Sequence, residues 1–187
     1  RKHVVKVMKQ VLAKYHVGGQ VAGAVEAAFQ AQEVFQQKMR EKAQEVITQA
    51  RAEGRQIIVL AGRPYHLDKE INHGIHKLIT SLGLAVITED SISALGEMPT
   101  LHVHNQWTYH SRLYRAAQYV TTQPDMQMVQ LVSFGCGIDA ITTDEVRTIL
   151  ESGEKLYTQL KIDEINNLGA AKIRLRSLMA AMAASHI

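Results

Sequence analysis

The stretch Ile57-Ile58-Val59-Leu60-Ala61 is followed at once by Gly62-Arg63-Pro64-Tyr65-His66. The first five residues form a continuous apolar run, which is typical of a parallel strand covered by helices on both faces. The glycine and the proline that follow are typical of a loop. The sequence therefore predicts a buried strand at residues 57–61 that opens directly into a chemically rich loop.

Strand and helix patterns alternate from this run to the C-terminus. Further strands are predicted at residues 84–88, 128–134 and 156–162, the last nearer an edge of the sheet because its apolar residues alternate with polar ones. Helices are predicted after Asp68, from Thr108 to Val120, from a capping box of Thr142 and Glu145, and after Asn167. Four strands, each followed by a helix, indicate a doubly wound parallel sheet. We expect an α/β fold, a three-layer αβα, flavodoxin-like four-stranded parallel sheet of order 2-1-3-4, with a long loop at residues 89–106.

Residues 1–54 contain no proline and are predicted to be helical, with one break at Gly18-Gly19. After Val21 the larger apolar side chains recur on one helical face, at Val25, Phe29, Phe35, Met39, Val46 and Ile47. A helix of some 30 residues would be about 45 Å long, more than a domain of this size needs. Either its far end packs on a partner or another part of the protein, or the helix crosses this domain's own sheet. We expect a helical extension at 1–54 and the αβα domain at 55–187.

Composition narrows the class of protein. The 187 residues are 46% apolar and 21% charged, as expected for one globular domain with a helical appendage. The 21 Lys and Arg against 18 Asp and Glu give a net charge of +3 without a basic cluster, so we expect no nucleic-acid partner. No apolar stretch approaches the roughly 18 residues of a membrane span, so we expect a cytoplasmic protein without a membrane partner. The single cysteine excludes an internal disulfide framework and a self-contained Cys-rich metal site.

Four loops are expected to meet at the carboxyl ends of the strands, where parallel sheets bind their ligands. They comprise residues 62–66, 88–91, 135–139 and 163–167. The candidate binding residues there are Arg63, Tyr65, His66, Gly135, Gly137 and Asn166. Arg63 is suited to an anion or a carboxylate, or equally to a structural ion pair with Asp90 or Asp163. The loops lack the glycine spacing of a phosphate-binding loop, so we expect no ATP hydrolysis by this chain itself.

Cys136 lies between two glycines that would let a bulky ligand approach its sulfur. A thiol near a helix N-terminus has a lowered pKa, which favours metal ligation or nucleophilic chemistry. The alternative is a small buried apolar residue in a tight turn.

The histidines suggest weaker sites. His73 and His76 would share a helical face, and His102, His104 and His110 enrich a loop that also carries Trp107 and Tyr109. A role of this loop as an interface or lid is favoured over a metal site. Arg112 and Arg115 are expected on a solvated helix face.

Several strings taken together resemble a domain of the large multidomain acyl-CoA dehydratase activase proteins of anaerobic bacteria. They occupy residues 62–66, 70–75, 88–91, 106–117, 133–140 and 161–171, so the resemblance covers about residues 56–180, and the helical first quarter is matched weakly or not at all. The resemblance implies an iron–sulfur cluster between domains, with Cys136 as one ligand and Arg63, Tyr65 and His66 beside it. A cluster usually needs about four thiolates, so the remaining ligands would come from outside this segment.

Two main functions follow as expectations. The chain is either a domain of an ATP-linked iron–sulfur activase or reductase that contributes one cluster ligand, or a docking module without catalysis of its own. In the docking reading the crevice at the strand ends is packed shut. Its partners would be other domains of the parent chain or a 2-hydroxyacyl-CoA dehydratase. An acyl-CoA or anion site built on Arg63 and helix N-termini is a third reading.

Overall fold

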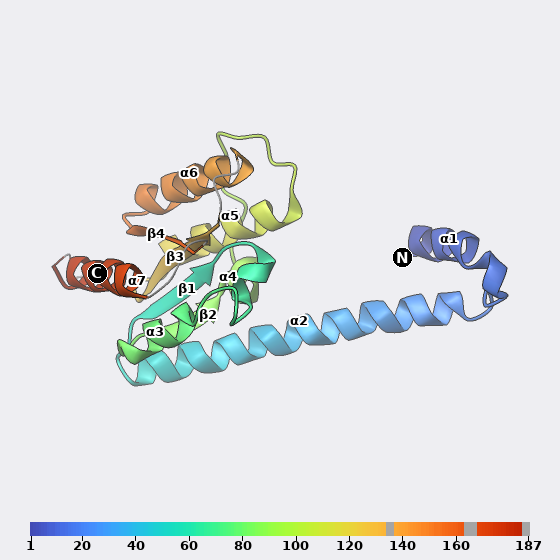
Figure 1. The fold of residues 1–187 in the computed structure, drawn as a ribbon, viewed down its shortest axis with the longest axis horizontal. Coiled ribbons are helices and arrows are strands. Elements are labelled where there is room, and N and C mark those ends of the chain that lie inside the picture. The colour runs from blue at the N-terminus through green and yellow to red at the C-terminus, as the bar shows by residue number, and fades with distance from the viewer. Residues whose placement is uncertain (134–136, 163–167, 185–187) are drawn as a thin grey trace. The chain divides into compact units, whose positions relative to one another are not determined.

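The computed structural model describes residues 1–133, 137–162 and 168–184 (Figure 1). The chain divides into two compact units, unit 1 (Arg1–Lys42) and unit 2 (Ala43–Ile187). The sequence predicts a boundary after residue 54 instead. The difference arises because helix α2 (Val21–Ala52) contributes its last turns to unit 2.

Unit 2 is built on a four-stranded parallel sheet of order β2-β1-β3-β4 (Figure 1). The strands are β1 (Ile57–Ala61), β2 (Ala85–Thr88), β3 (Met126–Val132) and β4 (Tyr157–Lys161). Ile57 at the start of β1 pairs with Ala85 on one side and Met126 on the other, so the carboxyl ends of the strands lie at one edge. The predicted strand order is confirmed.

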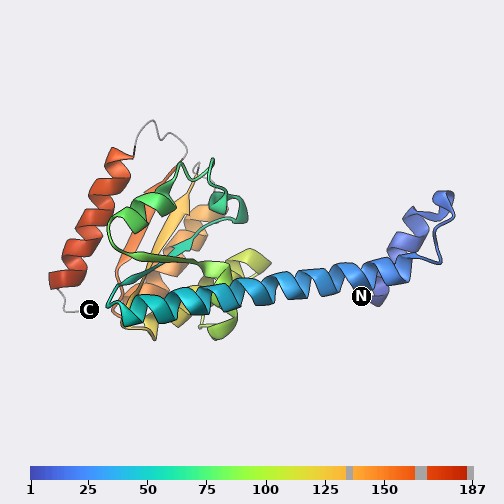
Figure 2. The same cartoon turned by 90° about the horizontal axis from the view of Figure 1, so that it is seen from below.

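Helices cover both faces of the sheet, and β1 and β3 are buried along their whole length. Ile57, Val59 and Ala61 face a core that includes α5 (Thr108–Thr121), α6 (Gly137–Ser152) and the end of α2. Ile58 and Leu60 face the opposite core, with α3 (Ile75–Ser81) and α7 (Gly169–Ala184) (Figure 2). The period of two along β1 therefore divides the core into two halves, and the predicted three-layer αβα fold is confirmed.

The end of α2 is part of this fold. Ala43, Ile47 and Ala50 are buried in the first of the two cores. The Arg51 Nε atom donates to Asp125 Oδ2 at 2.7 Å, just before β3, and this hydrogen bond holds the pKa of Asp125 below its usual value. The alternative in which the helix packs on this domain's own sheet is thus correct for its last turns.

Two predicted helix starts were wrong. The helix after Asp68 begins only at Ile75, because the Asp68 carboxylate accepts from the Glu70 backbone at 2.9 Å and holds a turn. The helix assigned to a Thr142 and Glu145 capping box begins earlier, at Gly137. Thr142 therefore lies inside it, and its hydroxyl donates to the Ile138 carbonyl at 2.8 Å.

Shorter elements lie between the main ones. The 3₁₀ helix η2 (Pro64–Leu67) follows β1, and α4 (Glu89–Ile92) with η3 (Ser93–Leu95) occupies the start of the loop predicted at 89–106. In α7 Ile173 is 68% exposed. Its neighbours Leu175 and Leu178 face the core instead.

Unit 1 is a helical hairpin. Helix α1 (Lys2–Val11) and the 3₁₀ helix η1 (Ala13–Tyr15) lead through a turn at Gly18-Gly19 into α2, as predicted. The Arg1 guanidinium donates to Glu26 at 2.7 Å and also to Glu33, and it lies 5.1 Å from the centre of the Phe29 ring. Phe35 was expected on the apolar face but is 62% exposed. No helix within the part of the chain that the structure describes has the length and apolarity to cross a membrane.

Candidate functional site

The carboxyl edge of the sheet holds an ion pair between the loop after β1 and the first turn of α6. Arg63, just past β1, donates from Nε to Asp139 Oδ1 at 2.9 Å, and its Nη2 lies 2.8 Å from the same oxygen. Both side chains are mostly shielded from solvent, at 22% and 13% exposure. The hydrogen bonds to Asp139 raise the pKa of Arg63 further above its already high value. The guanidinium thus has a carboxylate partner supplied by the chain itself.

His66 lies next to this pair and is almost fully buried. Its Nδ1 accepts the Arg63 backbone N–H at 3.1 Å, which assigns the proton of the neutral ring to Nε2. The Nε2 atom then donates to Ser133 Oγ, 3.2 Å away, and the same oxygen lies 3.2 Å from the Tyr65 hydroxyl. Burial lowers the pKa of His66, so the imidazole is neutral at pH 7.

Gly62 makes this arrangement possible. Its backbone φ of +154° is one that residues with a side chain rarely adopt. A Cβ at this position would also lie 2.6 Å from His66 Nδ1 and 3.0 Å from the Leu131 carbonyl oxygen. Only a residue without a side chain lets the histidine ring lie against the end of β1.

Little space remains between these groups. The cavity at this edge has a volume of about 10 Å³, and it is lined by Gly62, Arg63, His66, Tyr109, Leu113, Gln130, Leu131, Val132, Asp139 and Thr142. That volume is enough for about one water molecule. The described side chains around Arg63 and His66 are therefore closely packed.

The surface around Arg63 and His66 is apolar in places. Tyr65, Trp107, Ile138 and Ile141 are 40%, 49%, 38% and 54% exposed. Tyr65 follows β1, Trp107 precedes α5, and the two isoleucines lie in the first turns of α6, so all four lie near the carboxyl ends of the strands.

The histidines pack individually. The His110 ring lies 4.0 Å from the Tyr109 ring, centre to centre, and burial lowers its pKa. His102 Nδ1 lies 3.4 Å from Glu145 Oε1, and His76 Nδ1 lies 2.9 Å from Asn72 Oδ1. His73 lies outside α3, so it does not share a helical face with His76 as predicted. Among the residues described, no three His, Cys, Asp or Glu side chains come together as metal ligands would.

A second ion pair at this edge was missed by the sequence reasoning. The buried Glu89, directly after β2, accepts from Arg112 Nε at 2.9 Å and from Nη2 at 2.7 Å. Burial raises the pKa of Glu89 to about 7, although Arg112 opposes the shift. Arg112 was expected on a solvated helix face, and this was wrong because α5 turns it towards the sheet. The only available signal was an acidic residue immediately after an apolar strand.

The predicted site residues divide into two groups. Arg63, Tyr65 and His66 lie together, and Gly137 begins α6 beside Asp139. Arg63 forms an ion pair with Asp139, which the sequence did not predict, and the expected pair with Asp163 concerns a residue outside the described ranges. Gly135, Cys136, Asp163 and Asn166 lie outside the described residues.

A complete iron–sulfur site does not fit this chain. Such a cluster usually takes about four thiolates, and the sequence contains one cysteine. No described cluster of other ligand types compensates for the missing thiolates.

Comparison with known families gives one match. Residues 1–92 match a family described as "CoA enzyme activase uncharacterised domain". The resemblance to acyl-CoA dehydratase activase proteins is thereby confirmed. The match includes the helical first quarter, so the expectation that this part would be matched weakly or not at all was wrong. No curated protein and no solved structure matches the chain significantly.

Proposed function

Since residues 1–92 belong to the CoA enzyme activase domain family, we propose that the chain is a docking domain of a multidomain, ATP-linked CoA enzyme activase. In this proposal its sheet supplies a rigid surface for other domains of the parent protein or for a 2-hydroxyacyl-CoA dehydratase. The domain carries out no chemistry of its own.

The close packing around Arg63, at the carboxyl edge of the sheet, is the observation that carries this proposal. Sheets of this class bind ligands at that edge. Among the residues that the structure describes there, Arg63 is held by Asp139 and the cavity beside it is about 10 Å³. Exposed side chains of Tyr65, Trp107 and Ile141 lie around it. Exposed aromatic and aliphatic side chains are suited to binding a protein.

The ion pair of Arg63 with Asp139 also makes an acyl-CoA or anion site at Arg63 less favoured than docking. An acyl-CoA phosphate at Arg63 would have to displace the Asp139 carboxylate and open a cavity that holds about one water. The geometry gives the anion site no support beyond the presence of the arginine.

Trp107 provides a direct test, because it is the single tryptophan of the chain and is 49% exposed. The chain labelled with 5-fluorotryptophan is mixed with the separately expressed remainder of the activase, or with a 2-hydroxyacyl-CoA dehydratase, and followed by fluorine NMR. We expect the Trp107 resonance to shift and broaden, and Ile141→Asp to weaken the complex at least about tenfold. Ile173→Asp, on an exposed position of α7, is the matched control. An unshifted resonance with both partners, or equal effects of the two variants, would refute docking at this edge.

A contribution of Cys136 to a cluster shared between domains is our second proposal. What supports it is the thiol and its place in the sequence between Ser133, which follows β3, and Gly137, which begins α6. The test is anaerobic purification of the parent protein with and without Cys136→Ala. Unchanged iron content and an unchanged visible absorption band would exclude Cys136 as a ligand.

A further inference from the structure

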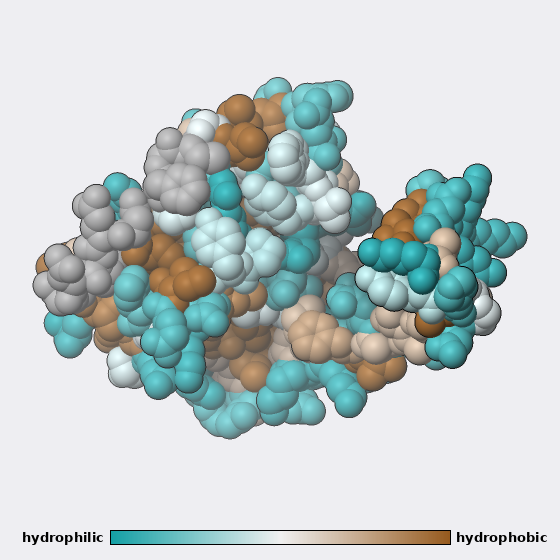
Figure 3. All heavy atoms as spheres, turned by 45° about the vertical axis from the view of Figure 1, so that its right-hand side comes forward, coloured by the Kyte–Doolittle hydropathy of each residue, from teal (hydrophilic) through white to brown (hydrophobic). Residues whose placement is uncertain are grey.

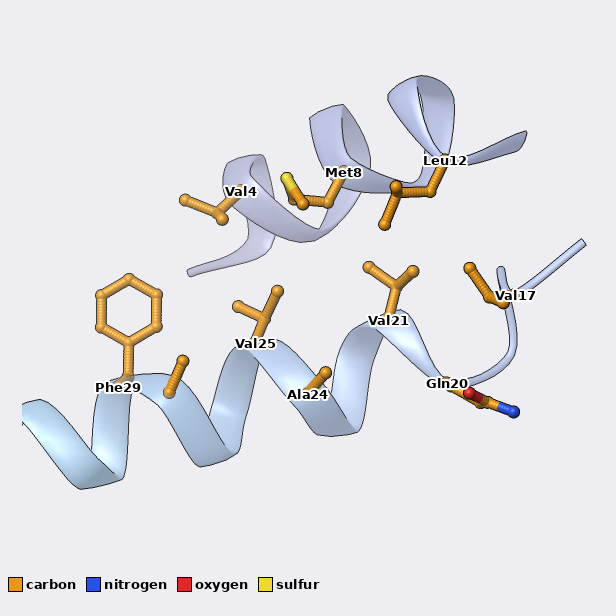
Figure 4. A pocket seen from close by; sticks show the side chains of 10 residues that line it. Val4, Met8, Leu12, Val17, Gln20, Val21, Ala24, Val25 and Phe29 are labelled. Carbon is orange, nitrogen blue, oxygen red and sulfur yellow. The ribbon is translucent and has the colours of Figure 1, made fainter. Parts of the chain in front are cut away.

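Unit 1 contains an apolar groove that is separate from the edge of the sheet. It lies between α1 and the first turns of α2, and its volume is about 440 Å³ (Figure 4). Its lining comprises Val4, Met8, Leu12, Val17, Gln20, Val21, Ala24, Val25, Ala28 and Phe29. Nine of these ten side chains are apolar, and those of α1 point towards those of α2 (Figure 4).

The two helices do not fill this groove by themselves. No residue of α1 is buried, and Val4, Met8 and Val11 are 38%, 37% and 62% exposed. Figure 3 shows apolar atoms of unit 1 reaching the surface among hydrophilic ones. A helical hairpin with an open apolar seam has the shape that accepts a third amphipathic helix through apolar side chains spaced three and four residues apart.

The positive charge of unit 1 indicates the kind of partner helix that would bind in the groove. Residues 1–42 carry eight Lys or Arg and three Glu, a net charge of +5, whereas residues 43–187 carry thirteen and fifteen, a net charge of −2. The first 25 residues include Arg1, Lys2, Lys6, Lys9 and Lys14 and no acidic residue. Lys2, Lys6 and Lys9 follow at steps of four and three, so they share a face of α1. The resulting positive field attracts acidic partners and repels a second copy of the same hairpin.

We propose that the groove between α1 and α2 binds an acidic amphipathic helix of a partner protein. The partner's apolar face would bury against Val4, Met8 and Val25, and its carboxylates would lie in the field of the lysines. A membrane surface is less suited, because the apolar side chains of α1 are turned into a concave groove towards α2 instead of forming one outward face (Figure 4). This site is independent of the docking surface proposed on unit 2, and neither depends on the other.

The test uses the whole 187-residue chain and two fluorescein-labelled synthetic helices. Both peptides have the same leucine and alanine pattern, but one has glutamate and the other lysine at its polar positions. Fluorescence anisotropy at about 50 mM and about 500 mM salt measures both affinities. We expect the acidic peptide to bind at least about tenfold more tightly at low salt, and the difference to shrink at high salt.

Variants locate the binding. Val25→Asp should abolish it, and a combined Lys6→Glu and Lys9→Glu change should weaken it at least about tenfold at low salt. A combined Lys77→Glu and Lys172→Glu change, on α3 and α7 of unit 2, is the charge-matched control and should leave the binding unchanged. Hydrogen exchange on the unmodified chain should show protection by the acidic peptide at residues 4–12 and 21–29, a measurement that does not depend on any variant folding.

Other occupants give distinct results. Equal binding of the two peptides, or no protection at these residues, overturns the proposal. Binding to phosphatidylserine vesicles without binding to the acidic peptide would assign the groove to a membrane surface instead. Concentration-dependent dimerisation that Val25→Asp abolishes would assign it to a second copy.

Discussion

Replacing Gly62 with alanine tests whether the carboxyl edge of the sheet is as tightly packed as described. The new Cβ would lie 2.6 Å from His66 Nδ1 and 3.0 Å from the Leu131 carbonyl oxygen. Neither neighbour gives way easily, because one is β3 backbone and the other belongs to a buried ring held from both sides. The ring has to move, and its hydrogen bonds have to break or lengthen.

The cost follows from these losses. The bonds from the Arg63 N–H to Nδ1 and from Nε2 to Ser133 contribute about 1 kcal/mol each. A φ of +154° costs a residue with a side chain roughly 1–3 kcal/mol more. We therefore expect Gly62→Ala to lower the free energy of unfolding by about 3–5 kcal/mol, which is a fall in Tm of roughly 6–20 °C for a domain of this size.

Urea unfolding followed by circular dichroism measures the change, with Gly83→Ala as the matched control. Gly83 also has a positive φ, +84°, but a Cβ there meets nothing within 4 Å. The control therefore carries backbone strain alone, about 1–2 kcal/mol. If both variants lose the same free energy of unfolding, a Cβ at position 62 does not clash with His66, and Gly62 is not packed against the ring as described.

Further predictions concern the ion pairs and one other glycine. In a double-mutant cycle of Arg63→Met and Asp139→Leu, urea unfolding should give a coupling free energy of about 1–2 kcal/mol, and a coupling near zero would contradict the pair. Because burial raises the folded-state pKa of Glu89 from 4.5 to about 7, its contribution is fully present below pH 4.5 and is lost as the pH rises through about 7. The stability of Glu89→Gln relative to the unmodified chain should therefore increase between pH 5 and pH 8, and a pH-independent difference would show that the carboxyl titrates normally. Gly96→Ala would place a Cβ 1.9 Å from the Arg115 carbonyl oxygen, so thermal unfolding should show a loss at least as large as that of Gly62→Ala.

The sheet could be predicted from the sequence because the apolar pattern of its strands is visible in short local stretches. The run at residues 57–61 is apolar without interruption and short, as is typical of a parallel strand buried on both faces. The start of α3 could not be predicted in the same way. Asp68 has the chemistry of a helix cap, and its carboxylate does accept backbone N–H groups, but these belong to a turn that delays the helix to Ile75.

The partners of charged side chains were the hardest part of the site to predict. Arg63 could be recognised as a residue in need of a carboxylate, but the choice of Asp139 depends on how α6 is set against β1. The prediction for Arg112 was wrong for the same reason. Arg112 lies on the border between the apolar and polar faces of its helix, and the sequence pattern does not predict which way such a side chain points. Residue types therefore predicted the location of the site, and tertiary packing determined its pairs.

The end of α2 determines where the smallest stable αβα domain of this protein begins. The short connection after the helix, at residues 53–56, looks like a natural joint, yet Ala43, Ile47 and Ala50 on its near side are buried with β1. A gene rearrangement that separated the chain at residues 53–56 would remove the last turns of α2 from one core. It would also remove the hydrogen bond from Arg51 to Asp125. A domain joined to the N-terminal side of this sheet must therefore be fused upstream of residue 43, and it would be attached through a helix.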